Sequence, residues 1–377
     1  MRIDMVEVFV VNMPMNVAIT SSFASESGTT RTIVRIKTDE GVVGYGESHG
    51  GRVTADIVER HREVIVGTDP YELEIFQKNL RMVPFFYGYA GYSAIAAVEM
   101  AYWDIIGKDL DVPLHRLIGG AFRDEVAVTA ILTRGLAGER SSGTDLAGAL
   151  VEVSHDLINR WGFPAMKLKG SKRIDEDVTI LEHLREVHPL LNLRVDPNAA
   201  WSVTDTVRAA PVMEDLDLEY VEDPCWGLES MARVRSRTRL RLCTNMCVVR
   251  LEDFAPSIHL GAVDIIHADP HKWGGIGPTR RLAALCDGFG IGLNMHSGGE
   301  LGISTACNIH LGVALPELTY AIDSLYYFLT DDVITQPHEL EFGAFCIPDG
   351  PGLGIHVDEA KLAHYAELNA VEGDYRH

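Results

Sequence analysis

The feature that most constrains the fold is an alternation of short apolar segments with helical stretches, which begins near Val126. Eight segments rich in strand-forming residues follow one another, and a helical stretch comes after most of them: AVTAIL, AMKLK, LNLRVD, LEYVE, LRLCT, VDIIHA, IGLNMH and LTYAI. Strands that alternate with helices form parallel βα units. Eight such units in succession predict an α/β fold, a (β/α)8 or TIM-like barrel, rather than an open sheet.

The residues before the barrel follow a different pattern. The segments TIVRIKT and VVGYGE flank the turn Asp39-Glu40-Gly41 and predict an antiparallel hairpin. Helical spacing then runs from Thr54 to about Leu117. We therefore expect an α+β capping domain over residues 1–122, a barrel over residues 123–336, and a C-terminal segment, residues 337–377, that packs back on the capping domain.

Two stretches of the capping domain allow more specific expectations. Residues 20–30 are rich in Ser, Thr and Gly and predict a loop, either a plain solvent loop or a flexible cover. The cluster Phe85-Phe86-Tyr87-Gly88-Tyr89 is expected to pack in the core rather than to serve as a binding platform.

Composition excludes several classes of partner. The 33 Lys and Arg against 54 Asp and Glu leave a net charge of −21, which argues against a nucleic-acid partner. The N-terminus lacks the pattern of a signal peptide, and no apolar run is long enough to span a membrane. The six cysteines form no CxxC pair and are typical of reduced residues. We expect a cytoplasmic homo-oligomer with no membrane partner.

Polar residues stand at the ends of the predicted strands, in phase with the βα repeat. From the second strand to the eighth they are Lys169, Asp196, Glu222, Asn245, Asp269, His296 and Asp323, separated by 27, 26, 23, 24, 27 and 27 residues. A barrel of this kind carries its active site at the carboxyl ends of its strands. Any one of these residues could be a helix cap or a buried polar group, but the full set predicts an active site.

The chemistry of the set indicates roles. Asp196, Glu222 and Asn245 offer only oxygen, which suits Mg²⁺. Asp269 can fix the tautomer of His296 and so make that imidazole a better acid or base. With Lys169 on the opposite side of the barrel mouth, this predicts a site that removes a proton next to a carboxylate.

The second strand contributes two lysines, Lys167 and Lys169, in MKLKG. Alternate residues of a strand point to the same side, so both ammonium groups are expected to face one space and to lower each other's pKa. A lowered pKa is what turns a lysine into a base near neutral pH.

The motifs together resemble those of a known family. MKLKG, VDPNAAW, YVEDP, the Asp269 and His296 pair, and TIVRIKTDEGVVGYGE are similar to segments of the enolase superfamily, mandelate racemase subgroup, over nearly the whole chain. Within that subgroup, CTNM and HSGGELGIS look most like the glucarate dehydratases.

The resemblance implies a Mg²⁺-dependent acid-sugar dehydratase, which abstracts the proton α to a carboxylate and eliminates the β-hydroxyl as water through an enediolate. It also implies residue roles: Lys169 and His296 as acid/base residues with Asp269 orienting His296; Asp196, Glu222 and Asn245 as Mg²⁺ ligands; and Lys167, Asn198 and Asp323 as contacts to a small-molecule sugar-acid substrate. An epimerase or racemase of a hydroxy acid using the same two bases is the alternative, and a non-catalytic barrel protein is a third.

Three positions depart from the glucarate dehydratase pattern. Residues 22–30 lack the histidine of that pattern, and Gly298 and Leu325 replace its asparagine and its second histidine. We therefore expect the proton-abstraction residues to be kept, and the identity of the substrate to be decided at these three places.

Overall fold

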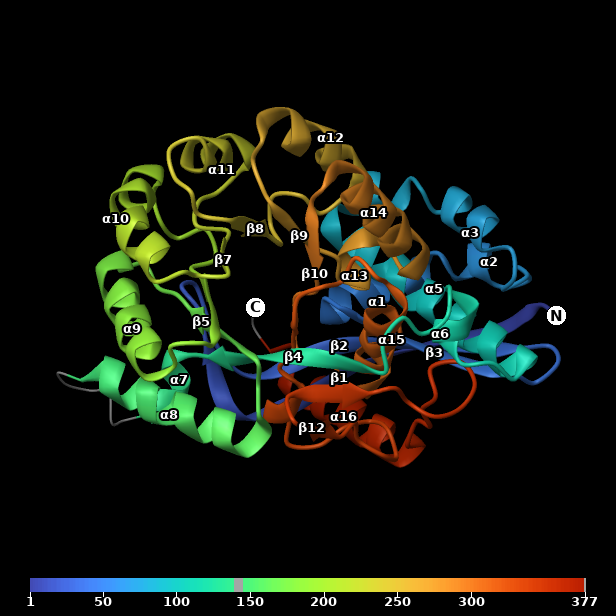
Figure 1. Ribbon diagram of the computed structural model, residues 1–377. Helices are drawn as coiled ribbons and strands as arrows, with labels where there is room; N and C mark the ends of the chain where they lie inside the picture. The colour runs from blue at the N-terminus through green and yellow to red at the C-terminus, as the bar shows by residue number, and fades with distance from the viewer. Residues whose placement is uncertain (139–144, 376–377) are drawn as a thin grey trace.

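A computed structural model describes residues 1–138 and 145–375. A three-stranded antiparallel sheet with its helices lies along one side of a barrel of parallel strands, and the barrel helices form an arc outside the strands (Figure 1). None of the helices in the described ranges is long and apolar enough to cross a membrane. The two-part architecture confirms the predicted fold class.

The capping domain combines a sheet in the order β1-β2-β3 with six helices. Its elements are β1 (Ile3–Thr20), β2 (Ser25–Thr38), β3 (Val43–His49), α1 (Gly51–Arg60), α2 (Arg62–Ile65), α3 (Leu73–Asn79), α4 (Val83–Tyr87), α5 (Tyr89–Leu110) and α6 (Leu114–Leu117). The central helix α5 lies directly on β3. A Cβ atom on Gly46 would lie 1.8 Å from the carbonyl oxygen of Ala97, so only glycine permits this approach.

Two expectations for this domain are wrong. Residues 25–30 belong to β2 rather than to a loop, because they pair with β1 in the register Asn12↔Thr30, Met13↔Thr29 and Pro14↔Gly28. Their Ser, Thr and Gly content hid a pairing that depends on a distant strand. The side chains of Phe85 and Phe86 are 75% and 72% exposed, so these two residues do not pack in the core.

The barrel contains all eight predicted strands: β4 (Glu125–Leu132), β5 (Ala165–Lys169), β6 (Asn192–Asp196), β7 (Tyr220–Glu222), β8 (Leu242–Thr244), β9 (Ile265–His267), β10 (Gly292–Asn294) and β11 (Ile322–Asp323). Strands β4 to β10 pair in parallel in chain order, and β11 pairs with β4. The amide of Asp323 donates to the carbonyl of Met295 at 2.9 Å, which joins β11 to the segment after β10.

Helices connect successive strands on the outside of the barrel: α7 (Arg134–Ala137), α8 (Leu146–Trp161), α9 (Ile174–Val187), α10 (Val203–Asp215), α11 (Leu228–Arg235), α12 (Leu251–Leu260), α13 (Pro270–Trp273), α14 (Ile276–Phe289) and α15 (Gly302–Ala314). Leu181 and Leu184 of α9 and Met213 of α10 are fully buried against the strands. Within the described residues, the helix that was predicted to end near Arg160 begins at Leu146. Residues 139–144 lie outside the described residues.

The C-terminal segment contacts both parts of the molecule. The short strands β12 (Leu340–Glu341) and β13 (Ala344–Cys346) form a hairpin, and β13 pairs antiparallel with β4. Helix α16 (Glu359–Glu372) packs on β1, where Asn369 Nδ2 donates to Asn12 Oδ1 at 2.9 Å. The domain boundaries drawn from the sequence stay a prediction.

Candidate active site

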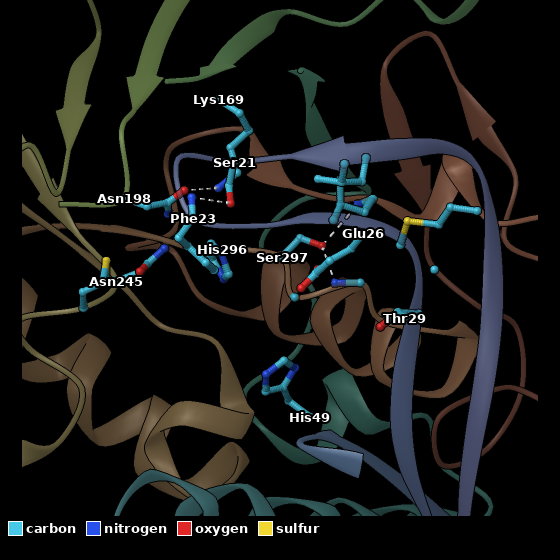
Figure 2. Close-up of a pocket in the computed structure, with 17 residues that line it drawn as sticks. Ser21, Phe23, Glu26, Thr29, His49, Lys169, Asn198, Asn245, His296 and Ser297 are labelled. Carbon is cyan, nitrogen blue, oxygen red and sulfur yellow. Dashed lines mark hydrogen bonds between the residues drawn. The ribbon is translucent and has the colours of Figure 1, made fainter. Parts of the chain in front are cut away.

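A pocket of about 240 Å³ lies between the carboxyl ends of the barrel strands and the β1–β2 hairpin of the capping domain. Figure 2 shows Lys169 and Asn198 on one side of this pocket, Glu26 and Thr29 on the other, and His296 with Ser297 between them. Of the predicted site residues, four line it: Lys169, Asn198, Asn245 and His296.

The three predicted metal ligands follow one another on β6, on β7 and directly after β8. Asp196 and Glu222 are fully buried, and Asn245 is 7% exposed. Asn245 Nδ2 donates to Glu222 Oε1 at 2.6 Å, so these two side chains are in direct contact. The cluster offers only carboxylate and amide oxygens as donors, and this donor set fits a hard cation such as Mg²⁺.

The loops after β6 and β7, which adjoin this cluster, have an unusual backbone conformation. Asn198 and Asp223 have φ angles of 50° and 37°, a left-handed region that non-glycine residues seldom adopt. A hydrogen bond of 2.7 Å from the amide of Ala199 to the carbonyl of Asp223 ties the two loops together. Such conformations persist where the surrounding contacts fix them, most often at functional sites.

Asp223 is a site residue that we missed in the sequence. Its carboxylate accepts from Thr244 Oγ1 at 2.6 Å and from the amide of Asn245 at 2.7 Å, and so it positions Asn245. Burial, followed by the neighbouring charge of Glu222, raises the pKa of Asp223 to about 7. Its place directly after Glu222 in the EDP motif is the signal that could have identified it.

Lys169 reaches the pocket from β5. Its Nζ lies 2.6 Å from Asp196 Oδ2 and 3.4 Å from Asn198 Oδ1. Asn198 in turn donates from Nδ2 to Asp196 Oδ2 at 2.9 Å. Lys169 therefore stands beside the oxygen cluster with its ammonium group on the pocket side.

Lys167 occupies a different position from the one expected for a second base. It is 1% exposed, does not line the pocket, and pairs with Glu222 at 2.8 Å and with Asp323. Burial alone would lower the pKa of Lys167, but the carboxylates of Asp323, Glu222 and Asp196 outweigh it and raise that pKa. The expectation that Lys169 lowers the pKa of Lys167 is therefore wrong, while contact of Lys167 and Asp323 with a substrate stays a prediction.

Asp269 and His296 form the expected pair. The amide of His296 donates to Asp269 Oδ1 at 2.7 Å, and His296 Nδ1 lies 3.2 Å from Asp269 Oδ2. The Nδ1 contact leaves Nε2 of the ring as the nitrogen available for acid/base chemistry.

A third residue, Lys272 of α13, joins this pair and was missed in the sequence. Its Nζ lies 2.9 Å from Asp269 Oδ2 and 3.3 Å from His296 Nδ1. Burial, followed by the positive charge of Lys272, lowers the pKa of His296. Both effects favour the neutral form of the imidazole, which is the form that can accept a proton.

The capping domain supplies most of the remaining wall. Met15, Ile19, Phe23, Glu26 and Thr29 come from the β1–β2 hairpin, His49 from β3, and Gly298 and Leu325 from the barrel side. The sequence did not identify His49, because only the fold brings the end of β3 to the barrel mouth. Of residues 22–30, Phe23, Glu26, Gly28 and Thr29 thus border the pocket.

A buried ion pair supports the wall behind Gly298. Arg31 Nε lies 2.7 Å from Glu47 Oε1, and neither side chain is exposed. Arg31 Nη1 donates to the carbonyl of Gly298 at 3.1 Å. Glu47 also accepts from the amides of Leu301 and Ser304, both at 2.8 Å, so the pair joins the capping sheet to the segment after β10.

Fold and site together define a (β/α)8 barrel whose mouth is closed by an α+β capping domain and holds a pocket lined by Lys169, Asn198, Asn245 and His296. Residues 5–119 match the mandelate racemase / muconate lactonizing enzyme N-terminal domain, and residues 149–361 match the enolase C-terminal domain-like family. The chain therefore belongs to the enolase superfamily, in its mandelate racemase / muconate lactonizing enzyme group. The family resemblance of the sequence motifs is confirmed.

Solved structures of relatives superpose closely. An enolase from Streptomyces coelicolor is 52% identical with a TM-score of 0.97 over 99% of both chains. An isomerase from Streptomyces coelicolor A3(2) is 51% identical with a TM-score of 0.92, over 98% of this chain and 99% of the other. An enolase from Thermobispora bispora, solved with magnesium and formate, is 32% identical with a TM-score of 0.91, over 100% of this chain and 95% of the other.

Curated relatives have several activities. A "probable glucarate dehydratase" from Streptomyces coelicolor is 33% identical and covers 89% of this chain and 84% of its own. A chloromuconate cycloisomerase from Cupriavidus pinatubonensis is 29% identical over 90% of this chain and 91% of its own. An N-succinyl-L-Arg/Lys racemase from Bacillus cereus is 27% identical over 96% of this chain and 97% of its own. The family thus includes lyases, isomerases and racemases.

Proposed function

We propose that the protein is a Mg²⁺-dependent acid-sugar dehydratase. It would remove the proton α to the carboxylate of a sugar acid and release the β-hydroxyl as water. The observation that carries this proposal is that Lys169 and His296 border one pocket beside a cluster of oxygen donors. The relative described as a glucarate dehydratase supports it.

Asp196, Glu222 and Asn245 would hold the Mg²⁺ ion. Relatives of 32% identity or less have been solved with magnesium, which supports the same ion here. When bound, the ion supplies positive charge beside the substrate carboxylate and makes the α-proton more acidic. Asn198 would contact the substrate from the loop that follows Asp196.

The two bases divide the proton transfers between them. Lys169, in its neutral amine form, or neutral His296 would remove the α-proton, and the electron pair of the broken C–H bond would expel the β-hydroxyl. His296 would gain a proton from the α-carbon or, when Lys169 is the base, from solvent. The protonated ring is a good acid because its pKa is lowered, and it would give that proton to the departing hydroxyl. The resulting enol becomes a 2-keto acid, so the net reaction is loss of one water.

An epimerase or racemase is the second candidate. The relative of 51% identity described as an isomerase favours it, and the same two residues would serve as the two bases. The test is to incubate a panel of sugar acids with Mg²⁺ in deuterated water. A 2-keto product supports dehydration, whereas recovered substrate with deuterium, inverted configuration and no 2-keto product overturns it.

Binding of Mg²⁺ should stabilise the fold. At an ion concentration of 100 times Kd, we expect the free energy of unfolding to rise by about 2.7 kcal/mol. Asp196→Ala should abolish the effect, and Asp156→Ala, at an exposed position of α8, should retain it. Thermal unfolding with Mg²⁺ and with EDTA measures both, and an equal Mg²⁺ response in all three proteins would favour a barrel without the proposed site.

Lys272 should set the acid limb of the pH profile. His296 faces Asp269, Glu222, Lys272, His271, His267 and Lys167. The two carboxylates act to raise its pKa, and among the charged neighbours Lys272 lowers it most. Because a base must be unprotonated, a lowered pKa extends activity to lower pH. Removing the ammonium group in Lys272→Met should raise the pKa of His296 and shift the acid limb of kcat/KM to higher pH. A profile that does not move would exclude this role.

A further inference from the structure

The order of the strands fixes the direction in which a substrate extends from the reactive carbon. The proposed metal ligands stand at the ends of β6, β7 and β8, whereas Leu325 follows β11. Three strands separate β11 from β7 in either direction, β8 to β10 on one side and β4 to β6 on the other. Leu325 lines the pocket and therefore lies across the mouth from the metal cluster. A ligand whose carboxylate is at that cluster and whose α-carbon lies between Lys169 and His296 thus extends the rest of its chain toward Leu325.

Apolar side chains form the wall at this end of the pocket. Met15 and Ile19 of β1 line the pocket together with Leu325. All three belong to one hydrophobic cluster, whose buried members include Ile131 of β4 and Phe328. Ile131 and Phe328 are only 2% and 4% exposed, so core residues rather than water lie behind the wall. A ligand group at this end therefore contacts a continuous apolar surface.

The hydroxyl groups of the β1–β2 hairpin offer this end of the pocket little hydrogen bonding. Ser21 Oγ accepts from the amide of Ala24 at 3.1 Å and donates to the carbonyl of the same residue at 3.2 Å. Thr29 is only 2% exposed, and its hydroxyl oxygen is buried. Glu26 also lines the pocket and already has an interaction partner. A hydroxymethyl group placed at the apolar wall would thus lose hydrogen bonds to water without an equivalent replacement, whereas a methyl group has none to lose.

We propose that the substrate is a sugar acid whose chain ends in a methyl group, and that Met15, Ile19 and Leu325 form the subsite for this methyl group. The inference rests on the proposed function and specifies its substrate class. The carboxylate is at the metal cluster, the α-carbon lies between Lys169 and His296, and the deoxygenated terminal carbon lies on the apolar wall. Burial of the methyl group contributes to binding because its surface leaves water.

The test compares pairs of sugar acids that differ only at the terminal carbon, 6-deoxygalactonate with galactonate and 6-deoxymannonate with mannonate, for example, across the stereoisomers with Mg²⁺. Turnover is scored both by 2-keto product and by deuterium exchange at the α-carbon. We expect kcat/KM for the accepted deoxy acid to exceed that of its hydroxymethyl counterpart by about 10-fold to 100-fold, the range for a single group in an apolar pocket.

The outcomes separate this inference from the proposed function. A hydroxymethyl acid turned over as well as or better than every deoxy acid overturns the methyl subsite and leaves the dehydratase proposal standing. Deuterium exchange and inverted configuration of a preferred deoxy acid, without 2-keto product, overturn the dehydratase proposal and leave the methyl subsite standing. Neither signal with any acid of the panel overturns both.

Leu325→Asn tests the apolar wall with little change in side-chain volume. We expect the preference for the deoxy acid to fall about 10-fold in this variant. Met15→Gln makes the same test at a half-buried position of β1 and should also lower the preference. Leu136→Asn, in the same hydrophobic cluster but not among the residues that line the pocket, is the matched control and should keep the preference. A preference that is unchanged in both Leu325→Asn and Met15→Gln, or that falls equally in Leu136→Asn, overturns the methyl subsite.

Discussion

Replacing either proposed base should stop the reaction without unfolding the protein. We expect Lys169→Met and His296→Asn each to lower kcat/KM by about 10³-fold to 10⁴-fold, near the upper range for loss of a general acid or base. Both side chains border the pocket, and bound Mg²⁺ would keep the charge of Asp196 compensated when its partner Lys169 is replaced. Their loss should therefore affect chemistry much more than stability.

The two variants should differ in which step they stop. Deuterium exchange at the α-carbon reports proton abstraction, and 2-keto acid formation reports the complete elimination. If Lys169 removes the α-proton, Lys169→Met loses both signals, while His296→Asn keeps exchange and loses product. The opposite pattern assigns the first step to His296, so the pair of measurements identifies the order of the two bases.

Lys172→Met is the matched control for Lys169→Met. Lys172 is exposed and lies three residues further along the chain, in the loop that follows β5. It should retain full activity, and with Mg²⁺ present all three variants should unfold at a temperature close to that of the parent protein. Activity that survives in both Lys169→Met and His296→Asn would contradict the assignment of the site.

The sequence predicted the barrel and the ring of strand-end residues because both follow from one repeat. A βα unit returns the chain to the same edge of the barrel, so residues such as Asp196, Glu222 and Asn245 must meet there once the strands are placed. The pattern needs only the spacing of strand ends, which a single sequence contains. The hairpin that the sequence predicted around Asp39 to Gly41 is also present in the structure. It was predictable because it depends on local turn chemistry.

The missed residues depend on contacts that spacing does not describe. Lys272 lies only three residues after Asp269, but its side chain reaches His296 because the four-residue helix α13 turns it back to the barrel mouth. His49 reaches the pocket only because the capping sheet docks there. Residues 25–30 looked like a loop because of their Ser, Thr and Gly content. They form a strand because pairing with residues 12–20 outweighs this local composition.

The misjudged pKa of Lys167 has the same origin and leads to the largest stability effect that we expect. Two lysines on one side of a strand suggested mutual repulsion, but β7 and β11 bring Glu222 and Asp323 to Lys167 inside the barrel. Removing one partner of a buried ion pair leaves an uncompensated charge, so Lys167→Met should lower the free energy of unfolding by about 3–5 kcal/mol at neutral pH. Chemical denaturation measures this loss.

The pH dependence of that loss tests its cause. Burial alone would raise the pKa of Glu222, but His267 and Lys167 outweigh it and hold this pKa well below its usual range. A depressed carboxylate pKa stabilises the parent protein above the unfolded value and loses that effect as the pH falls. In Lys167→Met the carboxylates become easier to protonate, so the difference between the two proteins should shrink toward acidic pH.

Two further variants distinguish the stability lost by leaving buried carboxylates without a partner from the stability lost by removing any lysine. Lys361→Met removes a lysine whose partner, Asp331, lies 2.6 Å away at the surface, and should cost less than about 1 kcal/mol. Adding Asp323→Asn to Lys167→Met removes one of the two carboxylates that lose Lys167 as a partner and should restore part of the stability. If Lys167→Met costs no more than Lys361→Met, the charges around Lys167 are not compensating one another, and its buried position must be stabilised by packing instead.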